Sequence, residues 1–431
     1  MATAEDRAAT LHDSRPLRVF APALFLLAVC TVINYADRGN FSIVAPILKQ
    51  QAGFSASRLG FLLGAFFWSY TLMQFVVGWL MDRFHASVLL AVGFLIWSLA
   101  TSATGLVSTF TALFLVRLLL GVGESVVVPG SSKILAMELP EHHRGFANGV
   151  LMSALRVGNA VGTLGAGVLI SRFDWHSVFI GMGLLSLLWL PPWLKWMPRS
   201  RPAARSSNAG PGVLEILSQR SFWGGVLGHF SFDYLLYFMI TWLPGYLELG
   251  RGLSLGKTTF VATTYYAVDA ITAIATGTVS DFWIRSGASA TLVRKTIMAI
   301  GYAIAVIAMV GCGLAGPHTY FAWLMVAALG SGVAGSAILA FPQSLAGPVA
   351  AGKWTGLQNG FANFAGILGP VITGVAVDRT GSFLAAFVIT GFVLLVGVFG
   401  WVLIIGKLEP VEWRSDKEVA AVALNQTAKS A

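Results

Sequence analysis

Long apolar runs alternate with short polar segments along almost the whole chain. Twelve of these runs reach about 20 residues, the length of helix that crosses the hydrocarbon core of a bilayer. The pattern therefore predicts an all-α polytopic membrane protein with twelve transmembrane helices. We expect the helices at about residues 18–48, 57–79, 86–105, 109–137, 144–171, 176–197, 221–248, 257–283, 292–315, 319–345, 354–377 and 382–406.

A long polar segment between the sixth and seventh runs contains Arg199, Arg201, Arg205, Pro202 and Pro211. It divides the apolar runs into two groups of six. The expected organisation is a cytoplasmic tail at 1–17, a six-helix bundle at 18–197, a cytoplasmic linker at 198–220, a second six-helix bundle at 221–406, and a cytoplasmic tail at 407–431.

The two halves resemble each other in sequence. GWLMDRFH at 78–85 separates the second and third runs, and GTVSDFWIR at 277–285 separates the eighth and ninth. In each segment an Asp, Asp82 or Asp281, follows a Gly by four positions. Parallel six-helix repeats around a site near the bilayer midplane are a known plan of transporters.

Composition and charge agree with a membrane protein. The chain of 431 residues is 56% hydrophobic and 11% charged, against about 25% charged residues in soluble domains. Its net charge of +9 does not indicate nucleic-acid binding, because the basic residues lie in short loops between apolar runs. With both termini cytoplasmic, inner segments hold 19 Lys and Arg and outer loops hold six, as the positive-inside rule requires.

Four motifs carry a resemblance to a known family. They are NYADR in the first run, FWSYTLMQ in the second, RLLLGVGE in the fourth and TWLPGYL at the end of the seventh. Together with the G-x-x-x-D-R loop, they resemble the anion:cation symporter family of the major facilitator superfamily over about residues 18–406. That family includes bacterial hexuronate, galactonate and glucarate transporters, and the sialin and vesicular glutamate transporters of animals.

Asp37 and Arg38 are adjacent ionisable residues in the first run. A charge at bilayer depth costs several kcal/mol, so such residues are functional candidates. Neighbouring side chains of a helix point about 100° apart, so we expect different partners. The guanidinium fork of Arg38 suits a substrate carboxylate, and Asp37 is a proton-coupling candidate with a basic partner elsewhere. The resemblance implies the same roles; a structural ion pair is the alternative.

Arg117 and Glu124 lie two helical turns apart in the fourth run and share a face. The resemblance implies that Glu124 is a second protonatable carboxylate and that Arg117 lies near the substrate or modulates that acid. Our hypothesis is that neutral Glu124 leaves Arg117 to the anion, whereas charged Glu124 pairs with it. A structural role is the alternative here too.

Arg156 lies in the Gly-rich fifth run, where close helix packing is expected. The resembled family more usually has a small or polar residue here. A second anionic group on the substrate, as in a dicarboxylate, would account for this Arg. An ion pair with Asp233 or Asp269 is the alternative. Asp269 also departs from the family pattern, and it could hold a cation or a second proton.

Hydroxyl and amide side chains in the apolar runs are candidates for binding a polyol chain, since they offer both donors and acceptors. Asn359 and Asn363 are one helical turn apart, and His229, Asp233 and Tyr237 form one stripe of the seventh run. Hydrogen bonding or packing between helices is the alternative for each. With the arginines above, the substrate-binding candidates are Tyr35, Tyr70, Gln74, Tyr237, Ser336, Gln358, Asn359 and Asn363.

The repeated loop motif predicts a gate. Carboxylates and guanidinium groups at helix ends can contact helix termini and neighbouring charges. Such contacts would hold the inner side closed. The gating candidates are Asp82, Arg83, Asp281 and Arg285.

The sequence thus predicts a proton-coupled symporter of a small organic anion, such as a hexuronate or aldonate, in the cytoplasmic membrane. A dicarboxylate, a phthalate-like aromatic acid and a transporter-like sensor are the alternatives. No P-loop, zinc-ligand pair or nucleophile elbow favours an enzyme, and we expect no metal and no cofactor. The expected partners are the organic anion, H⁺ and the bilayer, with no nucleic acid, and the chain is expected to be a monomer.

Overall fold

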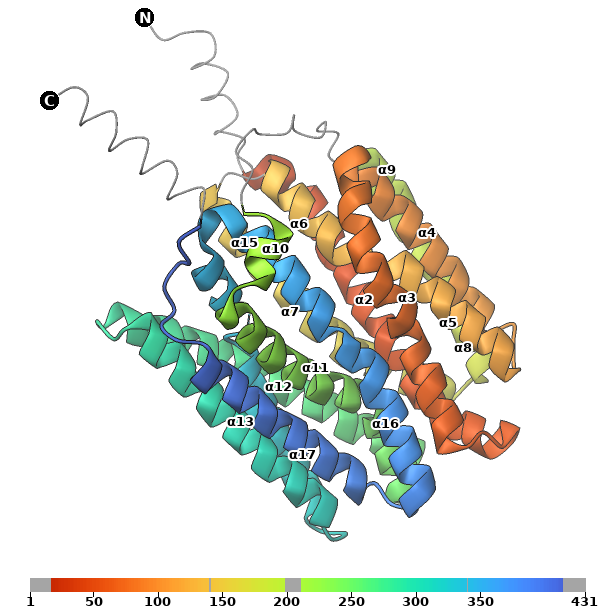
Figure 1. Ribbon diagram of the computed structural model, residues 1–431. Coiled ribbons are helices and arrows are strands. Elements are labelled where there is room, and N and C mark those ends of the chain that lie inside the picture. Colours follow the sequence, from red (N-terminus) through yellow and green to blue (C-terminus); the bar gives the residue numbers. More distant parts are fainter. Residues whose placement is uncertain (1–16, 139–140, 198–210, 339, 414–431) are drawn as a thin grey trace, which may run out of the picture. The chain divides into compact units, whose positions relative to one another are not determined.

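The computed structural model describes residues 17–138, 141–197, 211–338 and 340–413, and all regular structure within them is helical (Figure 1). The helices of the first half are α2 (Leu17–Ala52), α3 (Ala56–Arg83), α4 (Ala86–Thr104), α5 (Phe110–Glu124), α6 (Val127–Glu138), α7 (Glu141–Ile170), α8 (Trp175–Ser186), η1 (Leu187–Trp189) and α9 (Leu190–Trp196).

The second half begins with the short α10 (Val213–Leu217), which lies in the segment expected to be a linker. It continues with α11 (Arg220–Gly245), η2 (Tyr246–Gly250), α12 (Leu255–Arg285), α13 (Ala290–Leu314), α14 (Tyr320–Gly335), α15 (Ala340–Ala362), α16 (Phe364–Thr380), α17 (Leu384–Val398) and η3 (Phe399–Ile404). Residues 1–16 and 414–431 of the predicted tails and residues 198–210 of the predicted linker lie outside the described residues.

Each predicted span corresponds to helical structure. Among the described residues, eleven helical segments are long and apolar enough to cross a membrane. The remaining predicted span, 257–283, falls in α12, a 31-residue helix in which several Thr and Tyr residues and Asp269 reduce the apolar character. The first span reaches Ala52 and so is longer than expected. The all-α polytopic fold class is therefore confirmed.

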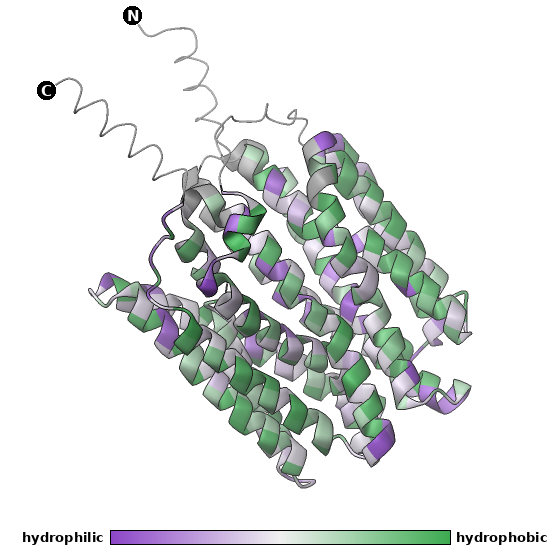
Figure 2. Cartoon of the chain, viewed as in Figure 1, coloured by the Kyte–Doolittle hydropathy of each residue, from purple (hydrophilic) through white to green (hydrophobic). Residues whose placement is uncertain are grey.

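The apolar character of the helix surfaces fits burial in lipid. Figure 2 shows that α13 and α17 are mostly hydrophobic along their length. On α17 and η3 the exposed large side chains recur every three or four residues, so they form one stripe of the helix. That stripe comprises Val388, Phe392, Leu395, Phe399 and Leu403.

Glycines bring α2 and α7 into close contact. A Cβ atom at Gly162 would lie 2.4 Å from the Cα atom of Ala36, and one at Gly158 would lie 2.6 Å from the carbonyl oxygen of Val32. Only a residue without a side chain allows the two backbones to approach so closely. The Gly-rich run was expected to pack closely, and here it fixes the part of α2 that carries Tyr35, Asp37 and Arg38.

Two further glycines place α5 between α3 and α4. A Cβ at Gly121 would lie 2.3 Å from the carbonyl oxygen of Phe66 on α3. A Cβ at Gly123 would lie 2.7 Å from the backbone nitrogen of Trp97 on α4. These two positions lie three residues and one residue before Glu124, so close backbone packing on both sides determines where that carboxylate lies.

The chain folds into two compact units. The first contains Met1–Ala203, Tyr237–Ala270 and Gly366–Ala386, and the second contains Ala204–Leu236, Ile271–Ala365 and Phe387–Ala431. Their boundaries fall within α11, α12, α16 and α17 as well as in the predicted linker. The division of the sequence into six plus six helices stays a prediction.

Candidate functional site

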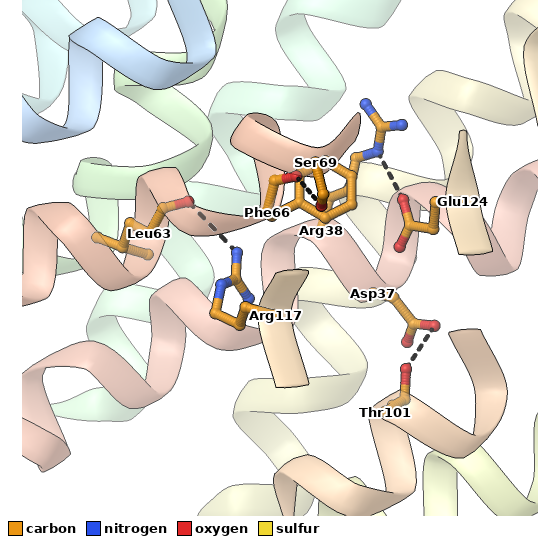
Figure 3. A network of polar contacts seen from close by, with 8 residues as sticks. All are labelled: Asp37, Arg38, Leu63, Phe66, Ser69, Thr101, Arg117 and Glu124. Atoms are coloured by element: carbon orange, nitrogen blue, oxygen red, sulfur yellow. Dashed lines mark hydrogen bonds and ion pairs between the residues drawn. The ribbon is translucent and has the colours of Figure 1, made fainter. Parts of the chain in front are cut away.

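The centre of the site is an ion pair between α2 and α5. Arg38 Nε donates a hydrogen bond of 3.0 Å to Glu124 Oε2, and both side chains are buried, with 3% and 0% of their surface exposed (Figure 3). Arg38 Nη2 has no hydrogen-bond partner in the described part of the chain, and the same holds for Glu124 Oε1. The pair therefore uses only part of the hydrogen-bonding capacity of each group.

Three aromatic rings surround the Arg38 guanidinium. Its central carbon lies 4.6 Å from the ring centroid of Tyr35, 5.0 Å from that of Phe66 and 4.6 Å from that of Tyr70. Phe66 and Tyr70 are one helical turn apart on α3 and stack on each other at 5.2 Å. Ring faces stabilise a desolvated cation by about 2 kcal/mol or more. The rings thus hold the guanidinium in place whether or not Glu124 is charged.

Arg117 lies on the same helix as Glu124 but contacts other groups. Its Nη2 donates to the carbonyl oxygen of Leu63 at 3.4 Å (Figure 3), and its guanidinium lies 4.3 Å from the ring centroid of Phe41. Its Nε has no hydrogen-bond partner among the described residues. Within this part of the chain, Arg117 is a buried cation without an ion pair.

Asp37 is held by neutral donors. Thr101 Oγ1 donates to Asp37 Oδ2 at 3.4 Å (Figure 3). Asn40 Nδ2 donates to Asp37 Oδ1 at 3.3 Å. As the helical spacing predicted, Asp37 and Arg38 face different partners. The expected basic partner of Asp37 is wrong for the described residues, because its partners here are a hydroxyl and an amide.

The expected pairing within α5 is also wrong for this structure. Glu124 was expected to pair with Arg117 when charged, but it pairs with Arg38 instead. The sequence spacing puts Arg117 and Glu124 on one face of α5, and both are buried there. The spacing could not show that the carboxylate of Glu124 pairs with Arg38 of α2.

Arg156 lies on α7 and is half-buried. Its Nη1 donates to the carbonyl oxygen of Met152, one turn earlier on the same helix, at 3.4 Å. In the first unit, which also contains Asp269, the structure shows no ion pair between Arg156 and that acid.

Gln74 is half-buried on α3, and its Nε2 has no hydrogen-bond partner in the described residues. Tyr237 on α11 lies against Phe67, with ring centroids 4.3 Å apart.

The amide candidates of the second half lie in the second unit. Trp354 Nε1 donates to Gln358 Oε1 at 3.1 Å, and Gln358 Nε2 lies 3.3 Å from His229 Nδ1. His229 Nε2 is 3.7 Å from Asp233 Oδ1. Both ends of the Gln358 amide are thus engaged, one within α15 and one with α11, and the second contact supports interhelical hydrogen bonding as the alternative for this residue.

The other second-unit candidates make local contacts. Asn363 Nδ2 donates to the carbonyl oxygen of Asn359 at 2.8 Å, and Ser336 Oγ donates to that of Val333 at 2.8 Å. Asn359 itself is half-buried. The substrate-binding roles of these residues stay predictions.

The gating candidates lie at helix ends. Arg83 is exposed in the last turn of α3, and Asp281 and Arg285 are exposed at the end of α12. The side chain of Asp82 lies outside the described part of the chain. The gate on the inner side therefore stays a proposal.

Sequence reasoning missed several residues of the site. Asn34, Asp37 and Asn40 recur every third position of α2, a spacing that marks one helix face. Asn34 lies beside Glu124 without a hydrogen bond of normal geometry. Phe66 precedes Tyr70 by one turn and could also have been found by spacing. Thr101 could not, since only the packing of α4 brings it to Asp37.

Comparison with known proteins identifies the family. A model of the Major Facilitator Superfamily matches residues 27–346, well over half of the chain. The chain belongs to the major facilitator superfamily. It is a transporter and not an enzyme.

Named relatives agree with the expected resemblance. The chain is 28% identical over 431 residues to the "Probable galactarate/D-glucarate transporter GudP" of Bacillus subtilis, covering 92% of this chain and 94% of that protein. It is 28% identical over 413 residues to the hexuronate transporter of the same organism, covering 90% and 95%. The resemblance to sugar-acid transporters is thus confirmed.

The fold is shared with a solved structure. A bacterial homolog of the human lysosomal transporter Spinster, in an inward-facing and occupied conformation, matches with a TM-score of 0.73. The identity is 20%, and the match covers 91% of this chain and 97% of that one. This likeness shows the major facilitator fold.

We predict that the Arg38–Glu124 pair is strongly coupled. Removing one partner of a buried ion pair leaves an uncompensated charge and costs about 3–5 kcal/mol. Arg38→Gln and Glu124→Gln should each lower the apparent melting temperature of the purified protein by roughly 5 °C or more. The double variant should recover most of that loss, as measured by scanning fluorimetry. Asp37→Asn, whose partners are neutral, is the matched control and should have a small effect; additive losses in the double variant would contradict the pair.

Proposed function

We propose that this transporter is a proton-coupled symporter of a small organic anion, a sugar acid such as a hexuronate or an aldonate, that works by alternating access. The observation that supports this proposal most directly is the buried Arg38–Glu124 pair with its aromatic surroundings. An arginine is the side chain best suited to a carboxylate ligand, and its present partner is itself a protonatable carboxyl group.

Competition for Arg38 couples the anion to the proton. A charged Glu124 occupies the guanidinium and repels an incoming carboxylate. A proton on Glu124 removes both effects, so the substrate can take the place of Glu124 on Arg38. By linkage, a bound anion favours protonation of Glu124 to the same extent. Proton and anion therefore bind together and leave together.

Asp37 is the second proposed proton carrier. Its partners Thr101 and Asn40 can remain hydrogen-bonded to it when its charge changes, because a hydroxyl is both donor and acceptor and an amide offers both groups. Facing outward, Asp37 and Glu124 take up protons, and the anion binds Arg38 and Arg117. Facing inward, the two acids release their protons, and the charged Glu124 then displaces the anion from Arg38.

Sugar acids are the proposed substrate class. The hydroxyl groups of Tyr35 and Tyr70 and the amide of Gln74 come from the same helices that place Arg38 and its rings, and they can serve the hydroxyls of a sugar chain. The printed names of the relatives, a hexuronate and a galactarate/D-glucarate transporter, point the same way. Asn359, Asn363 and Ser336 are proposed as further contacts of the substrate.

A dicarboxylate substrate is the second candidate. It is favoured by Arg156, whose only hydrogen bond among the described residues is to its own helix. Galactarate and glucarate carry two carboxylates, so a second guanidinium would suit such a substrate. A phthalate-like acid or a sensor function are further alternatives. We propose that the protein is a monomer in the cytoplasmic membrane. Both termini are proposed to lie in the cytoplasm, an orientation that the distribution of Lys and Arg supports.

Binding of organic acids can be measured by thermal shift of the purified carrier, because a ligand that binds the folded state raises its apparent stability. We expect sugar acids to raise the melting temperature and the matching neutral sugar alcohols to leave it unchanged. Arg38→Ala should weaken binding by roughly 30-fold or more, since it removes a buried charged partner. Arg38→Lys keeps the charge but loses the fork and should bind with intermediate affinity. Unchanged affinity in Arg38→Ala would refute its role.

Proton coupling can be separated from binding in proteoliposomes. Asp37→Asn and Glu124→Gln imitate the protonated acids, so both should exchange labelled substrate across the membrane. Neither should accumulate substrate against its gradient when the outside is made acidic. Glu409→Gln, a surface acid, should behave like the unsubstituted protein. Uphill uptake by both buried variants would show that the proton carriers lie elsewhere.

Substitution of Arg156 tests whether the substrate carries a second carboxylate. Arg156→Gln should weaken binding of a dicarboxylate by roughly tenfold or more, the value of one charged hydrogen bond. Binding of the corresponding monocarboxylate should change far less. Affinities for a matched pair, such as an aldarate and an aldonate of the same sugar, give the ratio directly. An equal loss for both acids would assign Arg156 a structural role.

A further inference from the structure

The last turn of α16 caps the first turn of α3. The backbone N–H of Ala56 donates to Asp378 Oδ1 at 2.9 Å, and that of Ser57 donates to Asp378 Oδ2 at 2.7 Å. The first N–H groups of a helix lack partners within the helix, and the positive end of the helix dipole attracts a carboxylate. Ser55 also caps this helix locally, at Arg58 N. Asp378 adds a second cap from more than 300 residues away in sequence.

Below this cap the backbones of α3 and α16 touch. A Cβ atom at Gly374 would lie 2.4 Å from the carbonyl oxygen of Ala56, and one at Gly60 would lie 2.4 Å from that of Pro370. Since any side chain at these positions would meet backbone, the contact requires glycine. The pairing of Asp378 with α3 is therefore part of a tight helix–helix contact, and it is not an isolated surface interaction.

A third helix, α11, contacts the same part of α16. Trp242 Nε1 on α11 donates to the carbonyl oxygen of Pro370 at 3.1 Å, and the Trp242 ring lies 5.9 Å from that of Phe383. All of these residues belong to the first unit. They join α3, from the first half of the sequence, to α11 and α16 from the second half.

The contact lies on the side of the membrane opposite the N-terminus. α2 starts at Leu17 and crosses once before the turn at residues 53–55, and α3 begins directly after that turn. With the termini in the cytoplasm, Asp378 and the start of α3 face outward. Helices from the two halves of the chain are thus held together at their outer ends.

We propose that Asp378 and the N-terminus of α3 form an outer latch, which closes when the transporter is shut to the outside and must break when it opens. This inference rests on the proposed alternating access and on both termini being cytoplasmic. Because the latch consists of two hydrogen bonds to a carboxylate and of glycine contacts, it is strong enough to bias the equilibrium. It includes no covalent bond, and so it can break in every cycle.

Distances between spin labels on α3 and α16 test the latch without a substrate. Arg58→Cys and Arg379→Cys place labels on two exposed positions beside it, and the native Cys30 and Cys312 are both buried and can be replaced by Ala. In lipid nanodiscs, Asp378→Ala should raise the ratio of long to short distances by roughly three- to tenfold, because it removes a helix cap formed by a charged acceptor. Asp378→Asn, which keeps one acceptor oxygen, should have a smaller effect.

Asp174→Ala is the matched control. Asp174 also caps a helix on the outer side, α8, where Ser177 donates to it from both backbone and side chain. These bonds hold the pKa of Asp174 below its ordinary value, but they lie within one local segment. Its loss should leave the label distances unchanged. If Asp378→Ala and Asp174→Ala give the same distances as the unsubstituted protein, the latch does not exist.

A second variant tests the contact without changing a charge. Gly60→Ala adds a methyl group that would meet the Pro370 carbonyl, so it should also increase the long distances. Gly165→Ala, whose added methyl meets nothing within 4 Å, is its control. If only Asp378→Ala has an effect, the glycine contact plays no part in the latch and that half of the inference is wrong.

The latch and the proposed function can fail separately. Longer distances in Asp378→Ala, with no organic acid bound or transported by the unsubstituted protein, would support the latch and reject the substrate proposal. Unchanged distances, with transport of a sugar acid intact, would reject the latch alone.

Discussion

The cost of a charge in a medium of low dielectric governs this structure. Arg38 cannot lose its proton, so it must be compensated wherever it is buried, and here Glu124 and three aromatic rings do so. The protonation state of a carboxyl group that neutralises a permanent cation controls whether that cation is free to bind an anion. An acid exposed to water has no such control. The proposed coupling of anion and proton follows from this one dependence.

Close backbone packing makes that pair possible. Gly158 and Gly162 bring α7 against α2, and Gly121 and Gly123 hold α5 between its neighbours. The helices that carry Arg38 and Glu124 are thereby fixed on more than one side. Glycines, which have no functional group, thus determine how closely the helices that carry the charged residues pack.

The charges and the neutral amides are distributed unevenly between the two units. The first unit holds Asp37, Arg38, Arg117, Glu124 and Arg156, whereas the polar candidates in the second unit are the amides and the hydroxyl of Ser336. The buried Gln358 there is bound to Trp354 on its own helix and to His229 on α11. The ionisable residues of the candidate site thus lie in the first unit.

The sequence by itself determined the all-helical membrane class and the approximate positions of the spans, because spans must be apolar over a fixed length. It also singled out the charged residues at membrane depth. Helical spacing was enough to separate the partners of Asp37 from those of Arg38. It could not show that Glu124 pairs with Arg38 and not with Arg117, or that Thr101 donates a hydrogen bond to Asp37. Those contacts join helices far apart in the sequence, and only tertiary packing decides which side chains meet.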